Sequence, residues 1–279
     1  MSVKLGIIGG GVMAEAILSR LLAQELYFAD HVLVSEPQAP RREFLAQKYK
    51  VKVTSDNRQT ATSASEVLLL AIKPQVFKTV AAELAPENGD NRPAMEQLPV
   101  VVSILAGMPL SQLESAFGEQ PVIRVMPNTP AIVGAGITAI APGKTVQPGQ
   151  IAQAKAIFEA VGEVVEVPEY LMDAVTAVSG SGPAYVAIMI EALTDGGVAA
   201  GLPRAIASQL ALSTVLGTAT LLKESQIHPA QLKDRTTSPG GTTIAGIAQL
   251  ERAGFRCALI EAVQTAYRRS QELGKIISG

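Results

Sequence analysis

The sequence has few of the side chains that carry acid–base, metal or disulfide chemistry. Its 279 residues include two histidines, one cysteine and no tryptophan. The lone Cys257 cannot form a disulfide within the chain, which fits a reducing compartment. No cluster of His, Cys, Asp and Glu has the spacing of metal ligands, so we expect no metal site. No serine and histidine are arranged as a nucleophilic triad, which argues against a hydrolase of that type.

Charge is also scarce. Charged residues make up 17% of the chain, the net charge is −2, and no block is strongly basic or acidic. Nucleic acid and anionic membranes are therefore poor candidate partners. The N-terminus lacks the pattern of a signal peptide, and the longest apolar-rich region, Val198–Leu222, is interrupted by Pro203 and Arg204. We expect a cytoplasmic protein whose apolar surface is partly buried against a second copy.

Three consecutive glycines lie near the N-terminus. An apolar run from Val3 leads into Gly9, Gly10 and Gly11, and a segment that can form a helix follows. The turn reads Gly9-x-Gly11-x-x-Ala14, the dinucleotide fingerprint with alanine in the third place. The first glycine makes the turn, the second admits a pyrophosphate, and the small third residue packs on the strand. A bound dinucleotide is expected, although a ligand-free turn in an α/β domain gives the same pattern.

Strand and helix patterns alternate along the first part of the chain. After a first helix that ends near Leu26, further strands are predicted at His31–Ser35, Val51–Thr54, Glu66–Ile72, Val100–Leu105, Val122–Val125, Gly136–Ile140 and Glu163–Val167. Helices are predicted at Arg41–Tyr49 and Gln150–Ala160, with Pro74 in the first turn of another and Pro86–Leu98 as a surface connection. The rhythm predicts a doubly wound, Rossmann-like α/β domain over residues 1–167 that binds the dinucleotide.

No clear strand follows Pro168. Helical spacing recurs at Ala174–Val178, Pro183–Ala200, Pro203–Lys223 and Gly254–Leu273, with many small residues. Residues 168–279 are therefore predicted to form an all-helical domain for substrate binding and dimerisation. A monomeric helical bundle is the alternative.

The choice of dinucleotide stays open. Glu36 follows the second strand, where an acid binds the ribose 2′-hydroxyl of NAD. Arg41 and Arg42 lie just beyond, and an arginine there holds the 2′-phosphate of NADP or is simply solvated.

The chemistry is expected at the carboxyl ends of the strands, where unusual turns gather. Neither histidine is a strong candidate: His31 opens a strand on the adenosine side, and His228 precedes Pro229 as a helix start. The site then works with hydroxyls, backbone amides and Lys73. This favours a reaction in which the cofactor supplies a hydride to an electrophile that needs little acid–base help, such as a C=N bond.

Several motifs together resemble pyrroline-5-carboxylate reductase, almost from end to end. They are Gly9–Ala14, Ala71–Gln75, Arg124–Pro130, Asp173–Tyr185 (DAVTAVSGSGPAY) and Leu232–Leu250 (LKDRTTSPGGTTIAGIAQL). The last two are close to diagnostic. The resemblance implies reduction of L-1-pyrroline-5-carboxylate to L-proline with NADPH or NADH. It also implies a helical domain that interleaves in a homodimer, often assembled further, with a decamer of dimers as one arrangement.

The resemblance also implies roles for individual residues. The pyrophosphate would bind Gly9, Gly11, Val12, Met13 and Ala14, and the adenosine ribose would lie near Ser35 and Glu36. The cofactor groove would be lined by Asn57, Ile72, Lys73 and Pro74, with Ala106 and Gly107 near the nicotinamide. The substrate carboxylate would bind Ser238, Gly240, Gly241, Thr242 and Thr243, chiefly through backbone N–H groups. Thr243 would be the catalytic residue, with its hydroxyl against the ring nitrogen.

Three points are left open. Many members that prefer NADPH carry an Asn/Arg-type pair where this chain has Ser35-Glu36-Pro37, and a carboxylate there repels a 2′-phosphate unless it is turned away. Thr243 also suits a helix N-cap. A hydroxyacid dehydrogenase, another imine reductase or a dinucleotide-binding regulatory protein would share the glycine turn.

Overall fold

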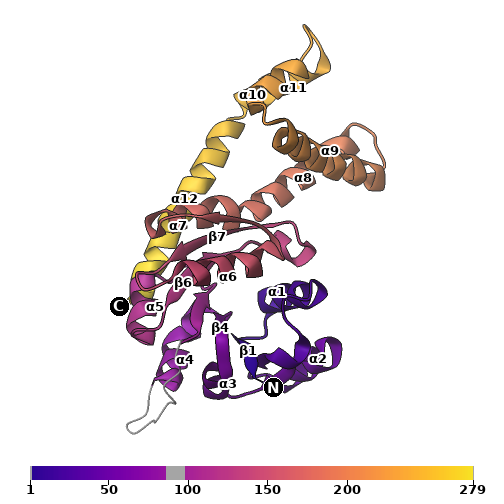
Figure 1. Cartoon of the computed structure of the whole chain (residues 1–279). Helices are drawn as coiled ribbons and strands as arrows, with labels where there is room; N and C mark the ends of the chain where they lie inside the picture. Colours follow the sequence, from indigo (N-terminus) through magenta and orange to yellow (C-terminus); the bar gives the residue numbers. More distant parts are fainter. Residues whose placement is uncertain (1, 86–97, 279) are drawn as a thin grey trace. The chain divides into compact units, whose positions relative to one another are not determined.

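The computed structural model describes residues 2–85 and 98–278, with side chains described as far as residue 274 (Figure 1). The chain divides into two compact units. The first comprises Met1–Gly180 and Ala266–Gly279, and the second comprises Ser181–Thr265. The boundary expected at 167/168 follows the last strand and stays a prediction. The connection predicted at Pro86–Leu98 lies, apart from its last residue, outside the described residues.

The first unit is built on an eight-stranded sheet within the described residues, in the order β3-β2-β1-β4-β5-β6-β7-β8. The strands are β1 (Val3–Ile8), β2 (Val32–Ser35), β3 (Lys52–Thr54), β4 (Ala64–Leu70), β5 (Val100–Ser103), β6 (Val122–Met126), β7 (Gly136–Pro142) and β8 (Gly162–Glu166). All neighbours pair in parallel except β6 and β7, which are antiparallel. The predicted strands are confirmed, each within two residues at either end.

Helices cover both faces of this sheet, which confirms the doubly wound fold. Because successive strand residues point to opposite faces, Ile7 and Ile8 enter different cores. One core contains buried residues of α1 (Val12–Ala23), α2 (Ala39–Tyr49) and α6 (Pro148–Glu159). The other contains those of α4 (Phe77–Leu84), α5 (Leu110–Phe117) and α7 (Met172–Val175). Two short helices, α5 and α3 (Asn57–Ser63), were not predicted from the sequence.

Short 3₁₀ turns and one π-helical turn complete the unit. The 3₁₀ turns are η1 (Ala29–His31), η2 (Pro74–Val76), η3 (Thr129–Val133) and η4 (Glu169–Leu171), and the π-helical turn is η5 (Thr176–Gly180). The helix predicted at Ala174–Val178 is thus the end of α7 running into η5. Pro74 lies in the first turn of η2, which leads into α4, as predicted.

The second unit is helical, and among the described residues no strand follows β8. It contains α8 (Gly182–Ala199), α9 (Arg204–Ser225), α10 (Pro229–Arg235), α11 (Thr242–Arg252) and the first part of α12 (Phe255–Ser278). Small residues let α8 and α9 approach closely, since a Cβ on Gly197 would lie 3.0 Å from that of Ala207. The long helices predicted from spacing are confirmed.

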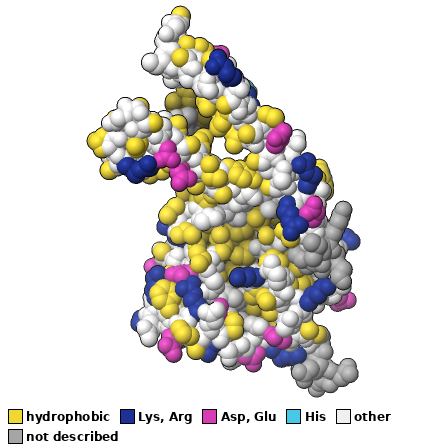
Figure 2. Space-filling view, turned by 180° about the vertical axis from the view of Figure 1, so that it is seen from behind, with side chains coloured by type: hydrophobic (Ala, Val, Ile, Leu, Met, Phe, Trp, Pro, Cys, Tyr) yellow, Lys and Arg dark blue, Asp and Glu magenta, His cyan; other side chains and the backbone are white. Residues whose placement is uncertain are grey.

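Much of the second unit's apolar surface is uncovered within one chain. Ile188 of α8, Leu216 of α9 and Ile260 of α12 are each 58% or more exposed. Figure 2 shows how widely hydrophobic side chains spread over the molecular surface. By length and composition alone, α9 would be long and apolar enough to cross a membrane. An exposed apolar stripe of this kind also fits burial against a partner subunit.

Candidate active site

The glycine turn between β1 and α1 has the geometry that a dinucleotide pyrophosphate requires. Gly9 has a φ of +96°, and a Cβ there would lie 2.6 Å from the Ala71 carbonyl oxygen. Gly11 is the N-cap of α1, and a Cβ there would meet no atom within 4 Å. Ala14 is 3% exposed and packs in the core. The space above Gly11 and the free amides of this helix start fit a phosphate.

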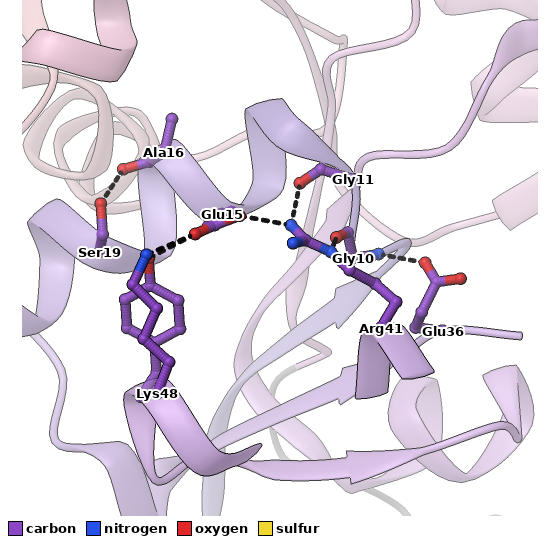
Figure 3. Close-up of polar contacts among 9 residues, drawn as sticks. Gly10, Gly11, Glu15, Ala16, Ser19, Glu36, Arg41 and Lys48 are labelled. Atoms are coloured by element: carbon purple, nitrogen blue, oxygen red, sulfur yellow. Dashed lines mark hydrogen bonds and ion pairs between the residues drawn. The ribbon is translucent and has the colours of Figure 1, made fainter. Parts of the chain in front are cut away.

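The residues after β2 lie against this turn (Figure 3). Glu36 is only 8% exposed, and its carboxylate accepts hydrogen bonds from the backbone N–H groups of Gly10 (2.9 Å) and Gln38 (3.0 Å). The Arg42 guanidinium donates to the carbonyl oxygens of Glu36 (2.7 Å) and Pro37 (2.8 Å). An acid and an arginine are thus both present where the adenosine ribose binds in this fold.

Ser35 and Asn57, both predicted to face the cofactor, contact each other. The Ser35 hydroxyl donates to Asn57 Oδ1 (2.7 Å), and Asn57 Nδ2 donates to Glu83 Oε2 (2.7 Å). Ser35 is fully buried at the end of β2, and Asn57 is the first residue of α3. This chain of hydrogen bonds links the end of β2 to α3 and α4.

Glu15, in the first turn of α1, anchors α2 to the glycine turn. Its carboxylate accepts hydrogen bonds from Arg41 (2.6 Å), Lys48 (2.9 Å) and Tyr49 (2.7 Å), and Arg41 also donates to the Gly10 carbonyl oxygen (2.6 Å) (Figure 3). Burial by itself would raise the pKa of Glu15. The hydrogen bonds from Tyr49, Lys48 and Arg41 outweigh it and lower the pKa to about 2. The cations also offset a negative charge that would otherwise repel a phosphate at this turn.

The lowered pKa of Glu15 predicts an acid-sensitive contribution to stability. The Glu15 carboxyl group has a pKa of about 2 in the folded chain, against a reference pKa of 4.5. It therefore stabilises the fold above pH 4.5. That contribution is lost as the pH falls from 4.5 towards 2. Glu15→Gln should lower the free energy of unfolding at pH 7 by about 1 kcal/mol, after allowance for its partial exposure. The loss should be smaller at pH 3.

Urea unfolding at both pH values, at one protein concentration, measures this difference. Glu166→Gln is the control, because Glu166 forms an exposed ion pair with Lys155 (2.9 Å). An equal loss at both pH values for Glu15→Gln would contradict the assignment.

A cleft of about 280 Å³ opens at the carboxyl ends of the central strands. It is lined by Met13, Ala71, Ile72, Ile104, Met126, Pro127, Asn128, Thr129 and Gly180. Of the predicted cofactor residues, Met13 and Ile72 therefore lie in its wall. Lys73 and Ala106 are exposed, and neither these two nor Pro74 and Gly107 are among the lining residues.

The cleft wall from Met126 to Thr129 was not among the predicted site residues, although the sequence marks this turn as unusual. Asn128 is 8% exposed, and its side-chain oxygen accepts from the Ile137 N–H (3.0 Å), which holds the turn against β7. Gly180 was also not among the predicted site residues, although it lies in the glycine-rich part of the Asp173–Tyr185 motif. The signal available for the turn at Met126 was its position, since it directly follows a predicted strand.

The predicted substrate-binding turn lies in the second unit, between α10 and α11. Gly240 has a φ of +68°, and a Cβ on Gly241 would lie 2.3 Å from the Ser238 hydroxyl oxygen, so the Ser238 side chain would have to move. Gly241 is the N-cap of α11, without a side-chain capping bond. Thr242 and Thr243 are thus the first two residues of the helix, and the reading of Thr243 as the N-cap is wrong. The turn offers free backbone amides at a helix start.

Two further features of the structure concern His228 and the side chains that could bind a metal ion. His228 is the N-cap of α10, and its Nδ1 accepts from the Ala230 N–H (3.2 Å), which confirms the helix start. Among the residues that the structure describes, no group of three or more His, Cys, Asp and Glu side chains could hold a metal ion.

Two family models match the chain, one in each part. Residues 4–107 match the model described as NADP oxidoreductase, coenzyme F420-dependent, which identifies an NADP-type oxidoreductase domain. Residues 169–273 match the model of pyrroline-5-carboxylate reductase dimerisation. The second match covers all the helices of the second unit, so the exposed apolar residues there belong to a dimerisation domain.

Whole-chain comparisons agree with these matches. The pyrroline-5-carboxylate reductase of Synechocystis sp. is 64% identical over 275 residues, 99% of this chain and 100% of that protein. That of Methanosarcina acetivorans is 44% identical over 98% of each chain. Among solved structures, the Coxiella burnetii enzyme superposes with a TM-score of 0.85 and 35% identity, over 98% of this chain and 99% of that one. The Plasmodium falciparum enzyme, solved with NADP bound, also gives 0.85, at 30% identity over 98% of each chain.

One conclusion follows from three observations. They are the sequence identity over the full length, the doubly wound sheet with its open glycine turn, and the helical dimerisation domain. The chain belongs to the pyrroline-5-carboxylate reductase family.

Proposed function

We propose that this protein completes proline biosynthesis by reducing L-1-pyrroline-5-carboxylate to L-proline, with the hydride supplied by bound NADPH or NADH. The observation that carries this proposal is the 64% identity to the Synechocystis enzyme over essentially the whole of both chains. The open space at Gly11 supports it, because a Cβ there would meet no atom within 4 Å, which leaves the backbone open to a pyrophosphate. The NADP bound to the Plasmodium falciparum relative supports the same class of cofactor.

The cofactor groove is assigned to residues of the first unit. The backbone around Gly9, Gly11 and Val12 holds the pyrophosphate, with Met13 and Ala14 behind it. Ser35 and Asn57 form the floor under the adenosine. Ile72 lines the cleft directly, while Lys73, Pro74, Ala106 and Gly107 lie in the turns that follow β4 and β5.

The substrate carboxylate is assigned to the turn from Ser238 to Thr243. The amides at the start of α11 point out of the helix and carry the positive end of its dipole, so they favour a carboxylate. Gly240 and Gly241 let the backbone itself be the recognition surface. The Thr243 hydroxyl donates to or accepts from the ring nitrogen and thereby orients it.

The chemistry asked of the protein is modest. The C=N bond is already electrophilic once its nitrogen carries a proton, so no strong acid or base is required. The protein's contribution is to hold the ring in one orientation, through the carboxylate and the nitrogen, and to exclude water. This agrees with the lack of a histidine that could act as an acid or base in the described part of the site.

Cofactor preference is proposed to depend on Glu36 and Arg42. The Glu36 carboxylate is satisfied by two backbone N–H groups, which reduces its repulsion of a 2′-phosphate without removing its charge. Arg42 binds only carbonyl oxygens in its described contacts, so its guanidinium keeps donors for a phosphate.

Two substitutions should shift the preference in opposite directions. Glu36→Gln should raise the ratio of kcat/KM for NADPH to that for NADH by roughly tenfold, the effect of about 1.4 kcal/mol of charge repulsion. Arg42→Ala should lower the same ratio. Steady-state kinetics with both cofactors measures it, and an unchanged ratio in both variants would contradict the assignment.

Assembly and location are part of the proposal. The uncovered apolar residues of α8 and α9 are proposed to be buried in a homodimer, which assembles further into a ring of dimers. A cytoplasmic location is proposed because the chain has a single cysteine, which fits a reducing compartment. Sedimentation of the purified protein would test the assembly, and a monomer at micromolar concentration would contradict it.

The reductase activity itself is tested by oxidation of NADH and of NADPH in the presence of pyrroline-5-carboxylate, followed at 340 nm. Loss of absorbance that depends on the imine is expected. No loss with either cofactor would overturn the proposal.

A further inference from the structure

A buried cation lies next to the cleft and is not used by the proposed chemistry. Arg124, in β6, is only 6% exposed. Its guanidinium lies 3.4 Å from the Glu169 carboxylate and 3.8 Å from the Asp173 carboxylate. A buried guanidinium without such partners would be strongly destabilising. The two acids therefore tie the segment after β8 to the middle of the sheet.

Asp173 has a second partner that extends the network. The same oxygen, Oδ1, accepts a hydrogen bond from the Ser270 hydroxyl at 2.7 Å. Ser270 is 4% exposed and lies in the C-terminal part of α12, which belongs to the first compact unit. Figure 1 shows this part of α12 beside α7. One carboxylate thus connects β6, α7 and α12.

The helix that carries Asp173 continues directly into the cleft wall. After α7 the chain forms the π-helical turn η5, which ends at Gly180 in the lining of the cleft. Hydroxyls brace this turn, since Thr176 donates to the Met172 carbonyl oxygen (2.8 Å) and Ser179 to that of Val175 (3.0 Å). Single π-helical turns are rare and are frequently found at functional sites.

The segments that the network joins, β6 and the chain from α7 to η5, also contact each other at the cleft. Arg124 and Met126 are two residues apart in β6 and so point to the same face of the sheet. Met126 lines the cleft, and a Cβ on Gly180 would lie 2.6 Å from its terminal methyl carbon. The Arg124–Asp173 pair and the Met126–Gly180 contact therefore join the same two segments at neighbouring points. Both segments contribute lining residues to the cleft.

We propose that Asp173 is a positioning residue for hydride transfer: by pairing with Arg124 and accepting from Ser270, it holds Gly180 against Met126 and fixes the wall of the cleft. The inference rests on the proposed reductase function. In this inference the network positions the reacting ring. The glycine turn and Ser35 bind the cofactor's pyrophosphate and adenosine.

Asp173→Asn tests this directly, because asparagine keeps the shape and can still accept from Ser270 but cannot pair with Arg124 as an ion. We expect kcat to fall about tenfold, since misplacement by an ångström costs up to about a hundredfold. The Kd of NADH, measured by fluorescence, should stay within about twofold, and the number of NADH molecules bound per chain should not change.

Ser270→Ala is the milder second variant and should lower kcat by about threefold in the same pattern. Glu166→Gln, which breaks the exposed pair with Lys155, is the matched control and should leave kcat unchanged. If kcat and the number of NADH molecules bound per chain fell equally, Asp173 would have a purely structural role and the inference would be overturned. An unchanged kcat in Asp173→Asn would also overturn it. Absence of turnover in the wild type would instead overturn the proposed function, and the inference with it.

Discussion

Replacing Gly11 with leucine should leave the fold intact and raise the Kd of NADH and NADPH by about a hundredfold or more, about 2.7 kcal/mol. The backbone at Gly11 has a φ of −68°, which every residue adopts without strain, and a Cβ there would meet no atom within 4 Å. The space is therefore empty of protein, and in this fold it belongs to the pyrophosphate. Fluorescence titration measures the affinity, and circular dichroism during heating measures the stability.

Gly9→Ala is the informative control in the same turn. Its φ of +96° and the 2.6 Å approach of a Cβ to the Ala71 carbonyl predict a fold destabilised by about 1–3 kcal/mol. The two glycines should thus separate binding from stability. If Gly11→Leu binds NADH as the wild type does, the pyrophosphate assignment is wrong.

Replacing Thr243 with alanine should lower kcat by at least about tenfold, or 1.4 kcal/mol, with little change in stability. The structure sharpens this prediction, because the N-cap of α11 is Gly241 and the loss of a capping bond is no longer an explanation. A fall in kcat then reports the loss of the contact between the hydroxyl and the substrate nitrogen. Stopped-flow reduction of the imine at saturating cofactor gives the rate most directly.

Thr243→Ser keeps the hydroxyl and is the matched variant. Its rate should stay within about threefold of the wild type, since a serine hydroxyl makes the same hydrogen bond. Thr243→Val, which is close in shape to threonine but lacks the hydroxyl, should be as slow as alanine. Wild-type turnover in Thr243→Val would mean that Thr243 only helps to shape the turn.

The sequence predicted the strands well because a mostly parallel sheet buries both of its faces. Residues 100–102 (VVV) and Leu68–Leu70 are continuous apolar runs, and such runs have few alternatives in a chain with this βαβ rhythm. The short helices α3 and α5 were harder to find, because seven or eight residues give little periodicity. The reversal of β7 relative to β6 also has no local signature, since it depends on how the short connection through η3 turns the chain.

The site was predicted unevenly, and for a physical reason. Glycines with a positive φ or a close neighbour, such as Gly9 and Gly240, leave a direct mark in the sequence. The contacts of Glu36, Arg41 and Glu15 do not, because they depend on the distance between α1, α2 and the end of β2. Asp173 is the extreme case, since its partners Arg124 and Ser270 are far away in the sequence and only the fold brings them together.

The most direct test of the account is to identify the product. Purified protein incubated with L-1-pyrroline-5-carboxylate and NADH or NADPH that carries deuterium at both positions of the nicotinamide C4 should form L-proline with one deuterium at C5. The proline and the oxidised cofactor should form in a one-to-one ratio, as mass spectrometry would show. Proline without the label, or oxidation of cofactor without proline, would contradict direct hydride transfer to the C=N bond.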